Sequence, residues 1–268
     1  MEFKAFLDEF KNQTGFDFCD YSDESLNRRL TKIQKETGLD FEGILSRVSI
    51  DVKFRQKIVE DITVNTTELF RDPDVWVNLY KKLYCSIPRN VTTAFWHIGC
   101  SIGLEVYSNL ILLNELNLLD NVRVMATDLN SSVLETAKNG VYVYDKQFEE
   151  NFNKVFTELG KNVRFDKYFD RDKDQLKLKP FLKAVPKFKQ QNLVSEPAPF
   201  PFKADFVFLR NVMIYFNNKL QVKIMKQVYD KMYDGAYLVL GKQERLPLNM
   251  SGRFEAIANL YRKNALII

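Results

Sequence analysis

The first third of the chain carries apolar residues at helical spacing and no convincing strand. One stripe is formed by Phe3, Phe6, Leu7 and Phe10. Recurrence at i, i+3 and i+4 is typical of an amphipathic helix. The same pattern predicts helices at 25–37, 41–48, 54–62 and 73–83, the last with proline in its first turn. Residues 1–85 are therefore expected to form a small helical domain.

From Thr93 onward, short β-type runs alternate with helical stretches. The predicted strands are 93–98, 122–127, a third within 204–216 and a fourth at 236–241. The helices between them are predicted at 104–116, 131–138 and 219–232. Alternating strands and helices imply parallel crossovers and an open, doubly wound α/β sheet. We expect this domain to span 86–268, with the tail 254–268 adding a pair of strands at the sheet edge.

A polar insertion interrupts this alternation between about 140 and 203. It begins with a helical stretch at 148–159, and lysines then alternate with apolar residues from Leu176 to Lys189. Alternation of period two predicts short strands with one basic face. We therefore expect a small antiparallel β-subdomain at about 160–195.

The first strand of the α/β part runs into a glycine turn, FWHIGCSIGLEVYSNLILLNE, at 95–115. Gly99 and Gly103 allow the backbone to approach a ligand, and the following helix N-terminus offers unpaired N–H groups. Asp128 ends the next strand, the usual position of an acid that binds ribose hydroxyls. This pattern favours a nucleotide-type ligand, although any α/β fold carries glycine in such turns.

Composition indicates a globular chain without extreme charge. Of the 268 residues 46% are hydrophobic and 28% charged, and the formal net charge is +4. Nucleic acid is not expected as a partner, because this basicity is modest. Three scattered cysteines predict neither a disulfide framework nor a metal site. With a charged N-terminus and no long apolar run, we expect a cytoplasmic protein without membrane insertion.

Five blocks, in order along nearly the whole chain, make the sequence similar to one known family. The chain resembles the CheR-type chemotaxis receptor glutamate methyltransferases, which use S-adenosylmethionine. The first block keeps Thr63, Asn65, Thr67, Phe70 and Arg71. The other blocks are GCSIGLEVYS, ATDLNSSVLETAKNGVY, FLRNVMIYFN and the glycine-led strand near 235–241.

The resemblance implies a cofactor site. S-adenosylmethionine would be bound and S-adenosylhomocysteine released. Glu105 would bind the amino group of the methionine part, with Gly99 beneath that part, and Asp128 would hold the ribose. Asn192 and Leu193 would flank the adenine, and Thr67 and Arg71 would lie at the methionine end.

The resemblance also implies a substrate site and partners. Arg71 would lie near the substrate carboxylate, and Arg210, Asn211 and Tyr215 would line the transfer site. The basic helix would dock acidic receptor helices through Arg28, Arg29, Lys32 and Lys35, although such a face is often simply solvated. The partner would be the cytoplasmic domain of chemotaxis receptors, some relatives also docking a receptor tail on the insertion. We expect a monomer.

The chain departs from the family pattern within the glycine turn and near its end. Ile102, Leu104 and Val106 replace the family's threonine, first glutamate and proline, and LGKQER replaces its L-G-H-S-E-S. Glu105 and Glu244 are retained. A glutamate substrate is ionised at neutral pH, its reference pKa being about 4.3, so no general base is needed. The lone histidine, His97, is accordingly interpreted as a core residue.

Three other functions remain alternatives. One is a catalytically weak module that binds S-adenosylmethionine or S-adenosylhomocysteine and regulates a partner. A dinucleotide oxidoreductase is disfavoured because the GxGxxG spacing is absent. A nucleic-acid methyltransferase is disfavoured because neither an Asn-Pro-Pro-aromatic nor a Pro-Cys signature occurs.

Overall fold

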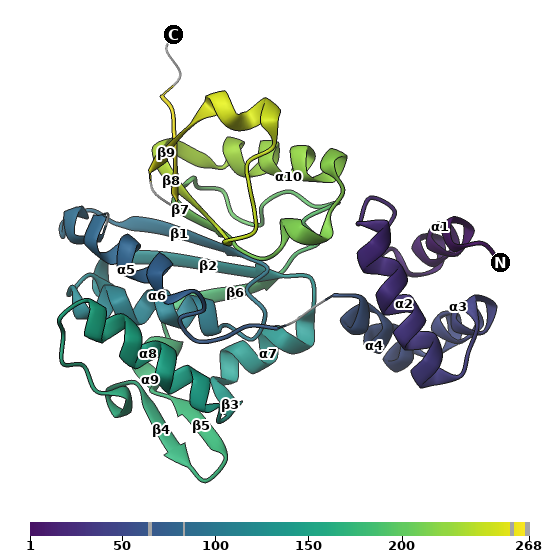
Figure 1. The fold of residues 1–268 in the computed structure, drawn as a ribbon, viewed down its shortest axis with the longest axis horizontal. Helices are drawn as coiled ribbons and strands as arrows, with labels where there is room; N and C mark the ends of the chain where they lie inside the picture. Colours follow the sequence, from purple (N-terminus) through teal and green to yellow (C-terminus); the bar gives the residue numbers. More distant parts are fainter. Residues whose placement is uncertain (64–65, 83, 258–259, 266–268) are drawn as a thin grey trace.

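The computed structural model describes residues 1–63, 66–82, 84–257 and 260–265. Four helices form the N-terminal part, as predicted: α1 (Phe3–Thr14), α2 (Asp23–Thr37), α3 (Phe41–Ile50) and α4 (Val52–Ile62). They form a separate helical lobe beside the α/β part (Figure 1). Among the described residues, no helix has both the length and the apolar character needed to cross a bilayer.

The α/β part contains a seven-stranded sheet in the order β6-β2-β1-β7-β8-β10-β9. Its parallel strands are β6 (Pro186–Gln190), β2 (Val122–Asp128), β1 (Thr93–Ile98), β7 (Ala204–Leu209) and β8 (Met232–Leu240). The antiparallel edge consists of β10 (Leu260–Lys263) and β9 (Phe254–Ile257). The predicted α/β sheet and the closing antiparallel pair are therefore confirmed, the latter within the described residues.

Alternate residues of the sheet pack into different cores. In β1, Phe95 joins the core formed with α5 (Pro73–Lys82), α6 (Leu104–Glu115) and α8 (Lys146–Glu158). Trp96 and Ile98 join the opposite core, formed with α10 (Asn218–Asp230) and the N-terminal helices. Successive residues of this buried strand therefore place apolar side chains on both faces of the sheet.

A small antiparallel sheet is present, but its composition differs from the prediction. It has the order β3-β5-β4, with β3 (Val141–Val143), β5 (Gln175–Leu178) and β4 (Phe169–Asp172). The prediction was wrong for 186–190, because β6 pairs in parallel with β2 in the main sheet. Phe188 packs there near Tyr107 of α6, with ring centroids 6.2 Å apart. Period-two spacing identifies a strand without specifying its partner. The remaining helices are α7 (Ser131–Asn139) and the short α9 (Pro180–Lys183).

Helix α5 belongs to the α/β part rather than to the helical lobe. Trp76 stacks on Phe208 of β7 with ring centroids 5.8 Å apart, and Phe70 contacts Phe152 of α8 edge-on. We therefore propose that the domain boundary lies near Thr63 instead of 85. The lobe is joined to the loop after β7, where the Ser22 N–H donates to the Tyr215 carbonyl at 2.8 Å.

Candidate functional site

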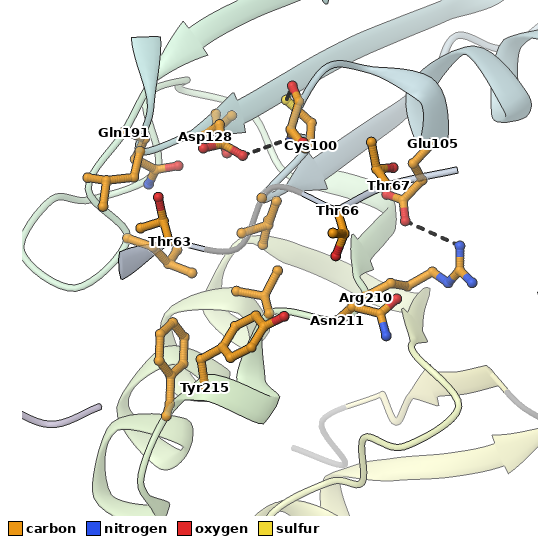
Figure 2. Close-up of a pocket in the computed structure, with 18 of the residues that line it drawn as sticks. Thr63, Thr66, Thr67, Cys100, Glu105, Asp128, Gln191, Arg210, Asn211 and Tyr215 are labelled. Atoms are coloured by element: carbon orange, nitrogen blue, oxygen red, sulfur yellow. Dashed lines mark hydrogen bonds and ion pairs between the residues drawn. The ribbon is translucent and has the colours of Figure 1, made fainter. Parts of the chain in front are cut away.

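A cavity lies at the carboxyl ends of β1, β2 and β7. Its walls come from the helical lobe, the segment after α4, the glycine turn, and the loops that follow β6 and β7. Figure 2 shows side chains from these separate segments converging on one space. The carboxyl edge of a parallel sheet is where ligands bind in open α/β folds.

The glycine turn forms the floor of this cavity. Gly99 has φ +66° and Gly103 has φ +85°. A Cβ on Gly99 would lie 2.5 Å from Cγ2 of Val212, so the loop after β7 leaves no room for a side chain. The turn therefore requires glycine both for its backbone angle and for its close packing.

Glu105, in the first turn of α6, places its carboxylate at one end of the cavity. Its Oε1 lies 2.9 Å from Nδ1 of His97, and its Oε2 accepts from Nη1 of Arg210 at 3.3 Å. The Glu105 side chain is 14% exposed. The carboxylate is thus held on both oxygens while one side remains open to the cavity, and Figure 2 shows it facing Arg210.

Arg210 is fully engaged by the protein at its terminal nitrogens. Its Nη2 donates to the Asp72 carboxylate and to the Arg71 carbonyl, both at 2.9 Å. The side chain is 1% exposed and its guanidinium lies over the Trp76 ring, 5.4 Å from the centroid. Arg210 is among the residues that line the cavity, and its place at the transfer site stays a prediction. Its contacts make it a residue that positions Glu105 and Asp72.

Asp128 ends β2 in the predicted position and is nearly buried. Its two oxygens accept from the Ser101 N–H at 2.8 Å and the Asn130 N–H at 3.0 Å. Burial raises the pKa of the Asp128 carboxyl, and these N–H groups partly oppose the rise. The carboxylate is fixed beside the glycine turn and forms part of the cavity wall.

The segment after β6 forms a further wall of the cavity. Asn192 and Leu193 line it, together with Gln191. The Gln191 N–H donates to the Asp128 carbonyl at 2.9 Å, which joins this segment to β2. The side chain of Asn192 accepts from the Val194 N–H at 3.1 Å and so shapes its own turn.

The loop after β7 contributes Asn211, Val212 and Tyr215 to the cavity. Asn211 has φ +60°, an uncommon conformation for a residue other than glycine. Glu244 holds this loop, because its carboxylate accepts from the N–H groups of Asn211, Val212, Met213 and Gly241 at 2.7–2.8 Å. Burial raises the pKa of Glu244, and the four N–H groups oppose the rise.

The four basic residues predicted to share an exposed docking face do not all lie on it. Arg28, Lys32 and Lys35 are exposed, whereas Arg29 is only 7% exposed and lines the cavity. Its guanidinium lies over the Tyr215 ring, 4.5 Å from the centroid, and one nitrogen donates to the Ile62 carbonyl. Nε and Nη2 are buried and have no hydrogen-bond partner within the described ranges. Arg29 is therefore a buried cation beside the cavity and not part of a solvated face.

Thr67 and Arg71 lie at the cavity near the segment after α4. Nη1 of Arg71 donates to the Thr66 carbonyl at 3.3 Å, and the side chain is partly exposed. Asn65 of the same block lies outside the described residues. Within the described ranges the bond to Thr66 is the one hydrogen bond made by the Arg71 guanidinium, which leaves its other N–H groups for a ligand.

The departures in the glycine turn do not obstruct the cavity. Leu104 and Val106 are fully buried in the core beneath α6, and Ile102 packs against that core. None of the three lines the cavity. Lys242 forms an ion pair with Asp74 at 2.7 Å and lies 3.9 Å from Oδ1 of Asp72, whose Oδ2 accepts from Arg210. The apolar substitutions therefore change the support of α6 and leave the ligand space open.

Sequence reasoning missed several residues that shape the site. His97 was interpreted as a core residue, yet it contacts Glu105, and Asp72 and Glu244 were given no role. His97 shares its face of β1 with Phe95, which a period-two reading could have shown. The contacts of Asp72 and Glu244 join segments more than 30 residues apart, and no local pattern indicates them.

Comparison with known proteins identifies the family. The family model of the CheR methyltransferase SAM-binding domain matches residues 65–261, and the family model of the CheR methyltransferase all-alpha domain matches residues 1–63. The chain is 27% identical to a chemotaxis protein methyltransferase of Vibrio parahaemolyticus, covering 96% of this chain and 93% of that one. It is 26% identical to a chemotaxis protein methyltransferase of Borreliella burgdorferi, with 94% and 90% covered.

Among solved structures, the chain is similar to the plantazolicin methyltransferase BpumL in complex with a triazolic desmethylPZN analogue and S-adenosylhomocysteine. The identity is 11%, with 81% of this chain and 58% of that chain covered. The TM-score is 0.37. The family descriptions cover the chain from residue 1 to 261 with a single gap at residue 64. The chain therefore belongs to the CheR methyltransferase family and is an S-adenosylmethionine-dependent methyltransferase.

Proposed function

We propose that this protein transfers a methyl group from S-adenosylmethionine to glutamate side chains in the cytoplasmic domain of chemotaxis receptors. Family membership supports the reaction, and relatives named as chemotaxis protein methyltransferases support the setting. The protein would act in the cytoplasm as a monomer. The observation that favours an acidic substrate side chain is the buried guanidinium of Arg29 at the cavity.

The residues at one end of the cavity fit the cofactor. Glu105 offers a carboxylate to the ammonium group of the methionine part, and Gly99 leaves the backbone bare beneath it. Asp128 would accept from the ribose hydroxyls, with Asn192 and Leu193 beside the adenine. When bound, the cofactor supplies an electrophilic methyl group on a sulfonium.

Arg29 and Tyr215 supply an environment suited to a carboxylate. A buried cation without an anion is unfavourable by several kcal/mol, and a ligand carboxylate would remove that penalty. Nε and Nη2 of Arg29 have no hydrogen-bond partner among the described residues, but both atoms are buried, so the side chain would have to turn toward the cavity to meet a carboxylate in two-point geometry. Arg71, partly exposed at the same cavity, is a second cation that would orient the substrate or the cofactor carboxylate.

The reaction requires alignment rather than proton transfer. A glutamate side chain is already an anion at neutral pH, so the chain need supply no general base. The residues would hold the substrate oxygen in line with the methyl group and exclude water. Arg29 and Arg71 must position the carboxylate without neutralising it completely, because tight pairing would reduce its nucleophilicity.

The exposed cations of α2 support a docking surface for an acidic helix. Arg28, Lys32 and Lys35 lie at i, i+4 and i+7, so they share one face of the helix, and all three are exposed. An acidic receptor helix would be attracted to this face and guided toward the cavity, which lies next to α2.

Methyl transfer to receptor-rich membranes tests the proposal. Radiolabel from S-adenosylmethionine should enter the receptor as a base-labile ester. Binding of S-adenosylhomocysteine without any ester would instead favour the regulatory module, and labelling that resists base would exclude a carboxylate as acceptor. A chain that binds NAD but not S-adenosylhomocysteine would contradict both readings.

A further inference from the structure

A buried chain of polar groups leads from the core to the cavity and ends on Glu105. Nδ1 of His97 lies 2.9 Å from Oε1 of Glu105, and Nε2 lies 3.1 Å from Nδ2 of Asn109. The Asn109 carbonyl oxygen accepts from the Tyr84 hydroxyl at 2.7 Å. His97, Asn109 and Tyr84 are essentially inaccessible to water. Only the last member, Glu105, reaches the cavity.

Hydrogen-bond accounting determines where the protons lie in this chain. An ionised carboxylate only accepts, so Nδ1 of His97 must carry the hydrogen toward Glu105. The Asn109 amide nitrogen only donates, so Nε2 of His97 must accept and carries no hydrogen. His97 is therefore held as the neutral Nδ1–H imidazole.

Tyr84 fixes the direction of the Asn109 amide and with it the charge of His97. Reversing the amide would turn its oxygen toward Nε2, which could then bind a proton and make His97 a cation. It would also leave the Tyr84 hydroxyl hydrogen without an acceptor in a fully buried position, because Asn109 is its hydrogen-bond partner among the described residues. Tyr84 thus opposes the charged form of His97.

The charge of His97 decides how attractive Glu105 is to a cation. Arg210 already lies at Oε2 of Glu105, and it is shared with Asp72. A second cation at Oε1 would leave Glu105 between two positive groups. With a neutral His97, the carboxylate is oriented on both oxygens yet keeps charge and lone pairs for a third partner.

We propose that His97 is a positioning residue for the cofactor, which orients Glu105 through Nδ1–H while Asn109 and Tyr84 keep it uncharged. This inference rests on the proposed function, in which Glu105 binds the ammonium group of S-adenosylmethionine. His97 also stacks on Phe208 of β7, with ring centroids 4.2 Å apart and an interplanar angle of 14°, so packing alone is the competing explanation.

A pair of variants separates positioning from packing. His97→Phe keeps an aromatic ring against Phe208 and removes the donor, whereas His97→Asn loses the ring and keeps an N–H donor near the position of Nδ1. Calorimetry compares S-adenosylhomocysteine with methylthioadenosine, which lacks the amino-acid part. We expect His97→Phe to reduce the affinity for S-adenosylhomocysteine by about tenfold or more and the affinity for methylthioadenosine by less than about twofold. His97→Asn should restore part of the lost affinity for S-adenosylhomocysteine.

A measurement on the unaltered protein tests the charge directly. His97 is the single histidine of the sequence, so ¹⁵N-histidine labelling yields one pair of ring-nitrogen signals. We expect a neutral ring with hydrogen on Nδ1, with and without S-adenosylhomocysteine. Asn109→Asp should convert His97 to the charged form and weaken S-adenosylhomocysteine, since an aspartate accepts from Nε2–H.

The outcomes distinguish this inference from the proposed function beneath it. An imidazolium or an Nε2–H ring in the unaltered protein overturns the inference even if every variant misfolds. Equal losses for the two ligands in His97→Phe assign His97 to packing, while leaving the cofactor site intact. Failure of the unaltered protein to bind S-adenosylhomocysteine overturns both, and failure to prefer it over methylthioadenosine removes Glu105 from the ammonium site.

Discussion

Replacing Arg29 by methionine should separate stability from activity more sharply than any other change at this site. Methionine keeps most of the aliphatic stem and removes the charge. The folded protein loses one hydrogen bond to the Ile62 carbonyl and the contact with the Tyr215 ring. These are worth about 1.5–3 kcal/mol and about 0.5–2 kcal/mol. It also escapes the penalty of burying a guanidinium with two unpartnered nitrogens, which is several kcal/mol.

The two effects nearly cancel, so the free energy of unfolding should change by less than about 2 kcal/mol in either direction. Methyl transfer should fall far more. If Arg29 holds the substrate carboxylate, its loss should reduce kcat/KM by about 10² to 10³, the equivalent of roughly 3–4 kcal/mol. Stability would be measured by urea unfolding, and activity by radiolabelled methyl transfer to receptor-rich membranes.

Arg28→Met is the matched control, because Arg28 is the neighbouring arginine and is exposed. On a docking surface it should raise KM by a salt-dependent factor of a few and leave kcat unchanged. Two results would refute the reasoning about Arg29. One is a kcat/KM for Arg29→Met within about threefold of the unaltered protein. The other is a loss of more than about 4 kcal/mol in stability, which would make Arg29 a structural residue.

Further predictions concern two other residues of the cavity, Arg71 and Asp128, and Glu244, which holds the loop after β7. Arg71→Ala should keep S-adenosylhomocysteine affinity within about tenfold while reducing turnover by orders of magnitude; unchanged turnover would remove Arg71 from the site. Because burial raises the pKa of Asp128, the folded state binds a proton more tightly than the unfolded chain, and rising pH lowers stability between about 3.8 and the raised value. Asp128→Asn removes this contribution, so the unfolding free energy of the variant minus that of the unaltered protein should rise with pH over this range. The variant should also bind the cofactor more weakly. A difference in unfolding free energy that does not change with pH would contradict the raised pKa of Asp128. Glu244→Gln should leave two backbone N–H groups without an acceptor, lowering stability by about 2–6 kcal/mol in denaturant unfolding, and a neutral effect would show that the loop after β7 holds itself.

The sequence predicts β1, β2, β7 and β8 of the main sheet well because their apolar runs alternate with clearly patterned helices. The approach of Gly99 to Asp128 also follows from local rules, since adjacent parallel strands end at the same edge. The pairing of β6 does not follow, because the lysine alternation at 186–190 fits an antiparallel hairpin and a parallel edge strand equally well. The sequence likewise does not show that α5 packs on the α/β part, because this depends on which of the two cores Trp76 joins.

The sequence already contained a pattern that indicates burial of Arg29, but its charge led to the opposite interpretation. It lies three residues after Leu26 and four before Ile33, so helical periodicity puts it on the buried stripe of α2. Grouping it with Arg28 by residue type placed it on the solvated face. His97 was misjudged for the opposite reason. Its burial was predicted, but its contact with Glu105 depends on how the glycine turn folds α6 back over β1.

Two buried guanidinium groups line the same cavity, and the contrast between them indicates which one is reserved for a ligand. Arg210 has two carboxylates, Glu105 and Asp72, within 3.3 Å, so its charge is balanced by the fold itself. Arg29 has a carbonyl and an aromatic ring but no carboxylate bonded to it among the described residues. A fold that already balances one buried arginine with two acids has no structural need for a second that lacks them. We therefore propose that the substrate supplies the missing anion at Arg29, which would give the helical lobe carrying Arg29 a part in substrate binding at the wall of the cavity that it lines.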